Sequence, residues 1–138
     1  MRTVLLVMIS VGLALASDVF VDSKTGLMWQ DNSAAKYTKK DWQGALAFCE
    51  ELRLAGHDDW RLPIVKELQS VITPLSRYNP AVKSIFKNVG DSGYYWSSTE
   101  DESDEAFAWM MNFKRGYEYI NYKTYKRYVR CVRGDGQL

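Results

Sequence analysis

The chain has 138 residues, of which 46% are hydrophobic and 25% are charged, and its formal net charge is +1. This length suits one domain with a single core, and the near-balance of charge favours no class of partner. There is no internal repeat, no low-complexity segment and no Gly-X-Y tract, which excludes repeat and collagen-like architectures.

The N-terminus predicts a secretory signal over residues 1–16. Arg2 gives a minimal positive region, Val4–Leu15 is apolar, and Ala14-Leu-Ala16 is an A-x-A cleavage site. The apolar run is short for a membrane span, although an uncleaved anchor is the alternative. We therefore predict an exported protein, periplasmic, secreted or at the cell surface, with a single domain over residues 18–138 and no membrane span after cleavage.

A hairpin is predicted next. Phe20–Val21 and Leu27–Trp29 are short apolar runs on either side of a polar turn, and Gly26 can supply a positive φ near the end of that turn.

The following segment predicts a helix that begins at Thr38. Thr38 can cap the first amides, and Asp41 lies near the positive end of the helix dipole. One buried face is indicated by apolar residues at helical spacing, namely Trp42, Ala45, Leu46, Cys49 and Leu52. Gly56 is the predicted end of this helix.

A second helix is predicted after Pro63, which suits a first turn that needs no amide partner. Its apolar stripe is Val65, Leu68, Val71 and Ile72. Ile64 precedes Glu67 by three residues, so only the carboxylate half of a capping box is present and the start of the helix is expected to fray.

The rest of the chain predicts a turn at Tyr78–Ala81, an apolar anchor at Ile85–Phe86, and then β-structure. The strand-like segments are rich in aromatic and β-branched residues: Tyr94–Ser97, Ala106–Phe113, Tyr117–Tyr122 and Tyr128–Val132, with a turn at Gly116. The sequence therefore predicts an α+β domain with two helices packed on antiparallel sheets.

The two cysteines follow the signal, so an oxidising compartment predicts one disulfide between Cys49 and Cys131. The alternative is two free thiols, one of them a nucleophile, which would need a low-pKa environment.

Charge is unevenly distributed along the C-terminal half. Residues 91–105 carry six acids and no Lys or Arg, whereas residues 114–133 carry seven bases and one acid. Two local fields of opposite sign can steer a charged partner, pair with each other within the molecule, or join neighbouring subunits head to tail.

Neither catalysis nor metal binding is predicted. His57 is the one histidine, and no nucleophile motif accompanies it. Asp101, Glu102, Asp104 and Glu105 are potential Ca²⁺ ligands, but their spacing matches no EF-hand loop, which favours a solvated acidic loop. We predict no enzyme activity, no metal and no cofactor.

The C-terminal third predicts a binding surface because tyrosines alternate there with cations. The tyrosines are Tyr117, Tyr119, Tyr122, Tyr125 and Tyr128, and the cations between them are Lys123, Lys126, Arg127 and Arg130. Rings stack on a ligand while Lys and Arg neutralise sulfate, carboxylate or phosphate groups. The candidate contacts are Lys114, Arg115, Tyr122, Lys123, Tyr125, Lys126 and Arg127. The alternative is that alternate tyrosines face the core and the bases pair with the acidic loop.

Four phrases give the chain a family resemblance: Asp22–Trp29, Asp59–Pro63, Tyr95–Thr99 and Tyr128–Arg133. In order and spacing, from Phe20 to Arg133, they resemble the exported bacterial family DUF1566, best known as the C-terminal domain of a Legionella collagen-like adhesin. The resemblance implies a C-type-lectin-like fold, related to that of the formylglycine-generating enzymes, with a long-range disulfide between the first helix and the last strand.

The resemblance also implies a non-catalytic recognition and adhesion domain that binds polyanionic glycans such as glycosaminoglycans, with self-association and without nucleic acid. The oxidase chemistry of the related enzymes needs cysteines beyond the structural bridge, and this chain has none to spare. Calcium-dependent lectins carry Glu-Pro-Asn and Trp-Asn-Asp motifs that this chain lacks. The alternative is a periplasmic or surface protein-binding or structural module that uses residues 94–105.

Overall fold

The computed structural model describes residues 18–72 and 85–136, which form three helices and two sheets. In chain order the elements are β1 (Val19–Val21), β2 (Met28–Gln30), α1 (Ser33–Tyr37), β3 (Lys39–Lys40), α2 (Trp42–Glu51), α3 (Val65–Ser70), β4 (Tyr94–Glu100), β5 (Phe107–Asn112), β6 (Tyr117–Tyr122), β7 (Arg127–Tyr128) and β8 (Val132–Arg133). The predicted α+β class is confirmed.

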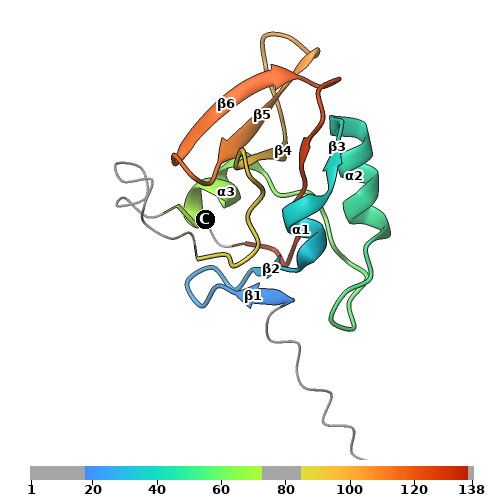
Figure 1. Cartoon of the computed structure of the whole chain (residues 1–138), viewed down its shortest axis with the longest axis vertical. Helices are drawn as coiled ribbons and strands as arrows, with labels where there is room; N and C mark the ends of the chain where they lie inside the picture. The colour runs from blue at the N-terminus through green and yellow to red at the C-terminus, as the bar shows by residue number, and fades with distance from the viewer. Residues whose placement is uncertain (1–17, 73–84, 137–138) are drawn as a thin grey trace, which may run out of the picture.

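The two sheets differ in size. The small one has the order β1-β2-β8, and the large one has the order β3-β7-β4-β5-β6. All pairs are antiparallel except β4 with β7. Figure 1 shows β6 at the outer edge of the large sheet, on the side away from α1 and α2.

The predicted N-terminal hairpin is confirmed. β1 pairs with β2 from Val19↔Gln30 to Val21↔Met28, and Gly26 has a φ of 76° in the turn. The Asp22 carboxylate accepts hydrogen bonds from the Lys24 amide and the Thr25 hydroxyl, which holds the turn closed.

The predicted start of the first long helix is wrong by three residues. Asp41 is the N-cap of α2, and its carboxylate accepts from the Gly44 amide at 2.8 Å. Thr38 instead follows the short helix α1, which the sequence analysis missed and which Asn32 caps. Lys39–Lys40 between the two helices is extended because it pairs with β7.

The predicted end of that helix is also wrong. α2 ends at Glu51, where the Leu52 amide bonds to the Cys49 carbonyl. Gly56 does have a positive φ of 78°, but it serves a separate turn in which Leu54 and His57 bond to each other.

At the start of α3 another element supplies an acceptor for one of the first amides of the helix. The Ile64 amide donates to the Glu67 carboxylate at 3.0 Å, as half of a capping box requires. The Val65 amide donates to the Thr99 hydroxyl of β4 at 2.9 Å. Arg61 holds the buried Glu67 carboxylate with two bonds of 2.6 Å, which ties the start of α3 to the preceding segment.

The strand predictions are confirmed with one change. The predicted strand Tyr128–Val132 is split into β7 and β8, which belong to different sheets. Of the predicted anchor, Phe86 is buried and Ile85 is exposed. The predicted turn at Tyr78–Ala81 lies outside the described residues.

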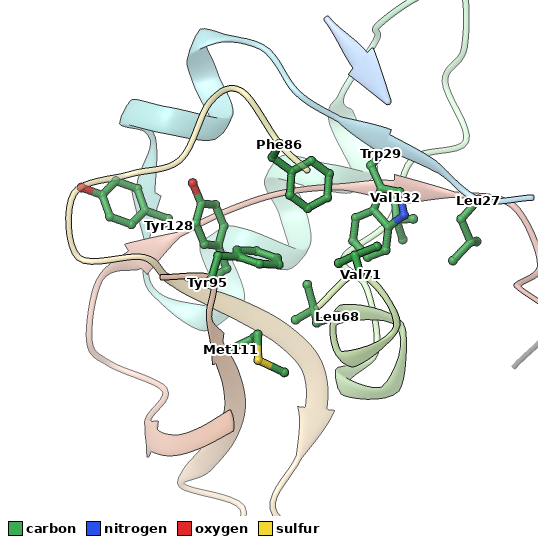
Figure 2. Close-up of a cluster of buried hydrophobic side chains, with 10 residues drawn as sticks. Leu27, Trp29, Leu68, Val71, Phe86, Tyr95, Met111, Tyr128 and Val132 are labelled. Atoms are coloured by element: carbon green, nitrogen blue, oxygen red, sulfur yellow. The ribbon is translucent and has the colours of Figure 1, made fainter. Parts of the chain in front are cut away.

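The core has two clusters on opposite faces of the large sheet. Figure 2 shows side chains of the first, in which Tyr95 and Met111 of the sheet pack toward Trp29 and Leu68. The second cluster contains the buried Trp60 and Trp96 together with the disulfide. The predicted Cys49–Cys131 bridge is present, with a Cα–Cα distance of 5.5 Å, and it joins α2 to the residue just before β8.

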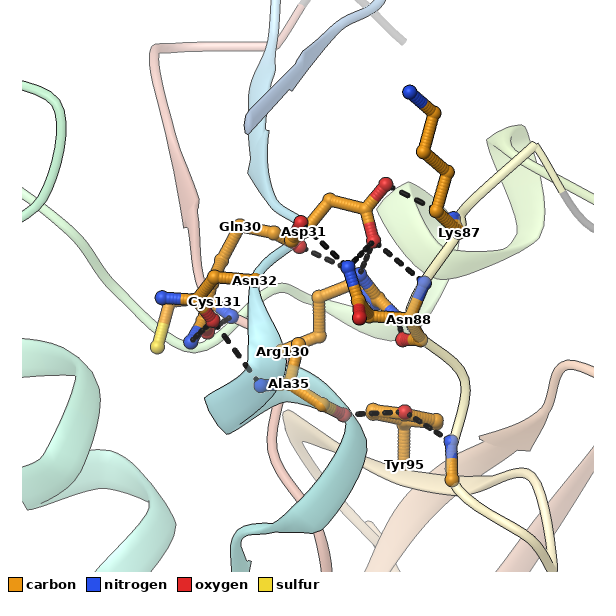
Figure 3. Close-up of polar contacts among 10 residues, drawn as sticks. Gln30, Asp31, Asn32, Ala35, Lys87, Asn88, Tyr95, Arg130 and Cys131 are labelled. Atoms are coloured by element: carbon orange, nitrogen blue, oxygen red, sulfur yellow. Dashed lines mark hydrogen bonds and ion pairs between the residues drawn. The ribbon is translucent and has the colours of Figure 1, made fainter. Parts of the chain in front are cut away.

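A buried guanidinium holds the segment that links β7 of the large sheet to β8 of the small sheet. Arg130 is fully buried and bonds to the carbonyls of Gln30 and Asn88 and to the carboxylate of Asp31 (Figure 3). Its charge also lies 3.8 Å from the centre of the Phe86 ring. Burial lowers the pKa of Arg130.

Candidate functional site

The segment from Lys123 to Arg127 carries most of the predicted contacts and crosses one face of the large sheet. It begins at the end of β6, where the Lys123 amide bonds to the Ala106 carbonyl, and ends in β7. The Lys123 carbonyl accepts from the Trp42 amide, so the start of α2 anchors the crossing.

Cross-strand register creates a row of side chains at one end of the large sheet. Lys40 of β3 pairs with Arg127, and β7 runs parallel to β4, with the Arg127 guanidinium 5.7 Å from the Tyr94 ring. Tyr94 pairs with Asn112, which pairs with Tyr117 of β6. Residues that lie side by side in a sheet point to the same face, so this row presents two cations and two tyrosines together.

Neighbouring aromatic side chains extend the row. The Tyr94 ring packs edge-to-face on Tyr119 at 5.4 Å, and Tyr119 lies 6.5 Å from Tyr117. On the other side of Arg127, the Tyr125 ring lies 5.5 Å from the guanidinium. Arg127 is therefore held between two rings, and an aromatic surface runs from β6 to β7.

We call this set the basic–aromatic surface: Lys40, Tyr94, Lys114, Arg115, Tyr117, Tyr119, Tyr125, Lys126 and Arg127. Lys39 points to the other face of the sheet, where its ammonium lies 4.9 Å from the centre of the Tyr128 ring. Lys114 and Arg115 belong to the basic–aromatic surface because their hairpin turn joins β5 to β6 at the same end of the sheet. Five of the seven predicted contacts lie here, namely Lys114, Arg115, Tyr125, Lys126 and Arg127.

The other two predicted contacts lie toward the opposite end. The Lys123 ammonium binds the Glu100 carboxylate at 2.7 Å and lies 4.3 Å from the Trp42 ring centre, so its charge is engaged within the molecule. Tyr122 is 49% exposed and packs on Phe107, and it borders the surface through Tyr125 at 5.8 Å.

The cations of the basic–aromatic surface are available for an external anion. Within the described residues none of Lys40, Lys114, Arg115, Lys126 and Arg127 forms an ion pair with a carboxylate. All except Arg127 are exposed. The predicted pairing of bases with the acidic segment is therefore limited here to Lys123 with Glu100.

Two residues that the sequence analysis counted among the alternating tyrosines and cations do not reach this surface. Tyr128 and Arg130 are buried, as the core-facing alternative predicts for part of the series. Conversely, Lys40 lies on this surface but was not predicted there, because the sequence placed Lys39–Lys40 inside a helix. Asn32 before Ser33-Ala-Ala was the signal of the earlier helix α1, which ends before these two residues.

The acidic loop, residues 101–105 between β4 and β5, lies at the other end of the sheet. Asp101 and Asp104 bond to Ser103 and to the Ala106 amide within the loop, whereas Glu102 and Glu105 are exposed. In the described parts of the chain no three His, Cys, Asp or Glu residues are grouped so as to hold a metal ion. The sheet thus has a basic end and an acidic end.

The alternative protein-binding module would use residues 94–105. Within this segment, most residues of β4 are buried or half-buried. Tyr95, Trp96 and Ser97 are fully buried, so the exposed part of this segment is mainly Glu100 and the acidic loop.

His57 lies in a depression of about 400 Å³ lined by residues 53–58. That lining contains no serine or cysteine beside the imidazole, so it offers no nucleophile–base pair. Close by, the Arg133 guanidinium bonds to the Asp59 carboxylate at 2.6 Å and lowers the pKa of Asp59.

Comparison with known proteins adds the family. No curated protein matches the chain, and no helix of the described residues is long and apolar enough to cross a membrane. The model of the Lcl C-terminal domain matches residues 18–133, which include almost every described residue. Membership of this family fits an adhesion-type domain. The resemblance found in the sequence is therefore confirmed, and the chain belongs to the Lcl C-terminal domain family.

Proposed function

We propose that this protein is an exported, non-catalytic recognition and adhesion domain that binds polyanionic glycans at the basic–aromatic surface. The observation that carries the proposal is the row across the large sheet that holds Lys40, Arg127 and Tyr94 on neighbouring strands and Tyr117 on β6, one strand beyond Tyr94. Family membership and the disulfide, which suits an oxidising compartment, support adhesion and export.

The arrangement matches the chemistry of a sulfated or carboxylated sugar chain. Anionic groups meet ammonium and guanidinium groups that pair with no carboxylate among the described residues, and pyranose faces stack on exposed tyrosines. Arg127 is already held between the Tyr94 and Tyr125 rings, so less side-chain freedom is lost when it binds an anion.

Binding to immobilised heparin and to a neutral glycan, across a salt series, tests this function. We expect retention on heparin that falls steeply with salt, because binding releases counterions from the polyanion, and no retention on the neutral glycan. Lack of heparin retention at low salt would contradict the proposal and would direct attention to the acidic loop and protein partners.

A further inference from the structure

The outer edge of β6 is an exposed sheet edge that could pair with another strand. β6 is the last strand of the large sheet, with β5 on one side and no described strand on the other. Its six residues include no Pro, Lys or Arg, and Tyr117, Tyr119, Ile120 and Tyr122 are each 36–49% exposed. Natural sheets usually protect such an edge with charges, Pro or a covering segment, because its free amides and carbonyls pair with other strands.

The hydrogen-bond phase of β6 shows which backbone groups face outward. The Lys123 amide bonds to the Ala106 carbonyl at 3.0 Å, and the register continues from Phe107↔Tyr122. Bonded pairs alternate along an antiparallel ladder, so the backbone groups of Glu118, Ile120 and Tyr122 point away from β5. In agreement, the Tyr122 amide donates to the neighbouring Asn121 side chain at 2.8 Å.

We propose that β6 pairs antiparallel with β6 of a second copy, with Ile120 on the two-fold axis. A two-fold perpendicular to the sheet places Ile120 opposite Ile120 of the second copy, and Glu118 opposite Tyr122. This register bonds all the outward amides and carbonyls of both strands, whereas centring on Glu118 or Tyr122 bonds fewer. The apolar Ile120 side chains then meet at the axis, and each Tyr122 hydroxyl lies beside a Glu118 carboxylate.

Charge complementarity supports a second copy as the occupant. The acidic loop lies beside the end of β6, since Ala106 is bonded to Lys123, and the Lys114–Arg115 turn lies just before its start. Antiparallel pairing brings the acidic loop of each copy next to the basic turn of the other. The backbones are about 10 Å apart, two strand spacings, which long side chains can bridge. Glu102, Glu105, Lys114 and Arg115 form no ion pair within the described residues, so they are available for these contacts.

The pairing also has a consequence for ligand binding. A two-fold perpendicular to the sheet keeps both basic–aromatic surfaces on the same side of one continuous sheet, so a long polyanion can contact both copies. The dimer itself does not depend on the proposed glycan binding.

Sedimentation of the oxidised protein over a concentration series measures the dimer. We expect Ile120→Lys to raise the dimer dissociation constant about tenfold or more, since two like charges then meet at the axis. The matched control is Val21→Lys, an equally exposed apolar residue on the edge strand β1 of the small sheet, which should leave dimerisation unchanged. Asn121→Ala should strengthen the dimer, because it frees the Tyr122 amide.

Cysteine cross-linking tests the register separately. Ile120→Cys should form an intermolecular disulfide readily, because the Cα atoms of a bonded pair lie about 5.5 Å apart. Glu118→Cys should not, since the two copies of residue 118 are then about 13 Å apart, while the double variant Glu118→Cys with Tyr122→Cys should cross-link. Equal rates for the two single variants, or a monomer at all concentrations, would overturn the proposal. Heparin retention by a monomeric Ile120→Lys variant would show that the glycan site stands independently.

Discussion

At the scale of single residues, the buried polar side chains matter most for stability. The fully buried Arg130 guanidinium interacts with the Asp31 carboxylate, two backbone carbonyls and aromatic rings. Arg130 was grouped with the other C-terminal cations because a run of charges does not show which member turns inward. Arg61 likewise pairs with a buried carboxylate, that of Glu67.

Replacing Arg130 by Met should destabilise the fold by about 3 kcal/mol or more, because the buried Asp31 carboxylate loses the cation that pairs with it in the described residues. Chemical denaturation measures this loss. Arg133→Met is the matched control, since its ion pair with Asp59 is largely exposed, and it should have little effect. Equal losses in the two variants would contradict the structural role assigned to Arg130.

Tyr95 should make the protein sensitive to alkali. Burial raises the pKa of Tyr95, whose hydroxyl donates to the Ala35 carbonyl and accepts from the Gly90 amide. The unfolded chain loses this proton near pH 10 while the folded chain keeps it, so the free energy of unfolding falls as pH rises above about 10.

Denaturation of the wild type and Tyr95→Phe between pH 8 and 11 checks this sign. The variant should be less stable at pH 8, where it lacks the two hydrogen bonds, and its deficit should narrow at higher pH. A deficit that grows with pH would contradict the assignment.

At the scale of secondary structure elements, the sequence predicts elements with strong local signals correctly, but it does not predict which distant strands pair. The hairpin at Gly26 and the apolar face of α2 were predicted because turn chemistry and helical spacing are local. The strand at Lys39–Lys40 was missed because only its pairing with β7, more than 80 positions later, makes it extended. The basic row could not be predicted for the same reason.

Thr99→Val tests the cap that β4 supplies to α3. It should cost about 1 kcal/mol, because the Val65 amide loses the hydroxyl that accepts its hydrogen bond. Ile64→Thr in the Thr99→Val background should recover part of this loss, since it restores a local capping box with Glu67. An unchanged free energy of unfolding in Thr99→Val would show that water replaces the hydroxyl without cost.

At the scale of the whole molecule, the disulfide contributes to stability, and the charge distribution gives the large sheet a basic end and an acidic end. The bridge joins residues 82 positions apart and sits in the second core cluster, between α2 and the chain before β8. The class of fold and the disulfide followed from composition, cysteine count and motifs. The separation of a basic end from an acidic end follows from the order of the strands, which the charge runs alone did not show.

Replacing both Cys49 and Cys131 by Ala should lower the free energy of unfolding by up to about 4.5 kcal/mol, the loop-closure contribution of a bridge of this span. Denaturation midpoints with and without the bridge measure it. A change close to zero would mean that the unfolded chain is already compact around these residues.

The central claim is that unpaired cations at the basic end bind the polyanion, and the salt dependence of heparin affinity tests it most directly. Lys40, Lys114 and Lys126 replaced together by Ala should reduce the slope of log affinity against log salt by up to about 3, because each lost contact releases about one counterion fewer. The matched control replaces three exposed lysines elsewhere, Lys24, Lys66 and Lys87, and changes the net charge equally. A slope near that of the wild type in the control and a reduced slope in the first variant is the predicted result, whereas equal slopes in both variants would contradict the claim.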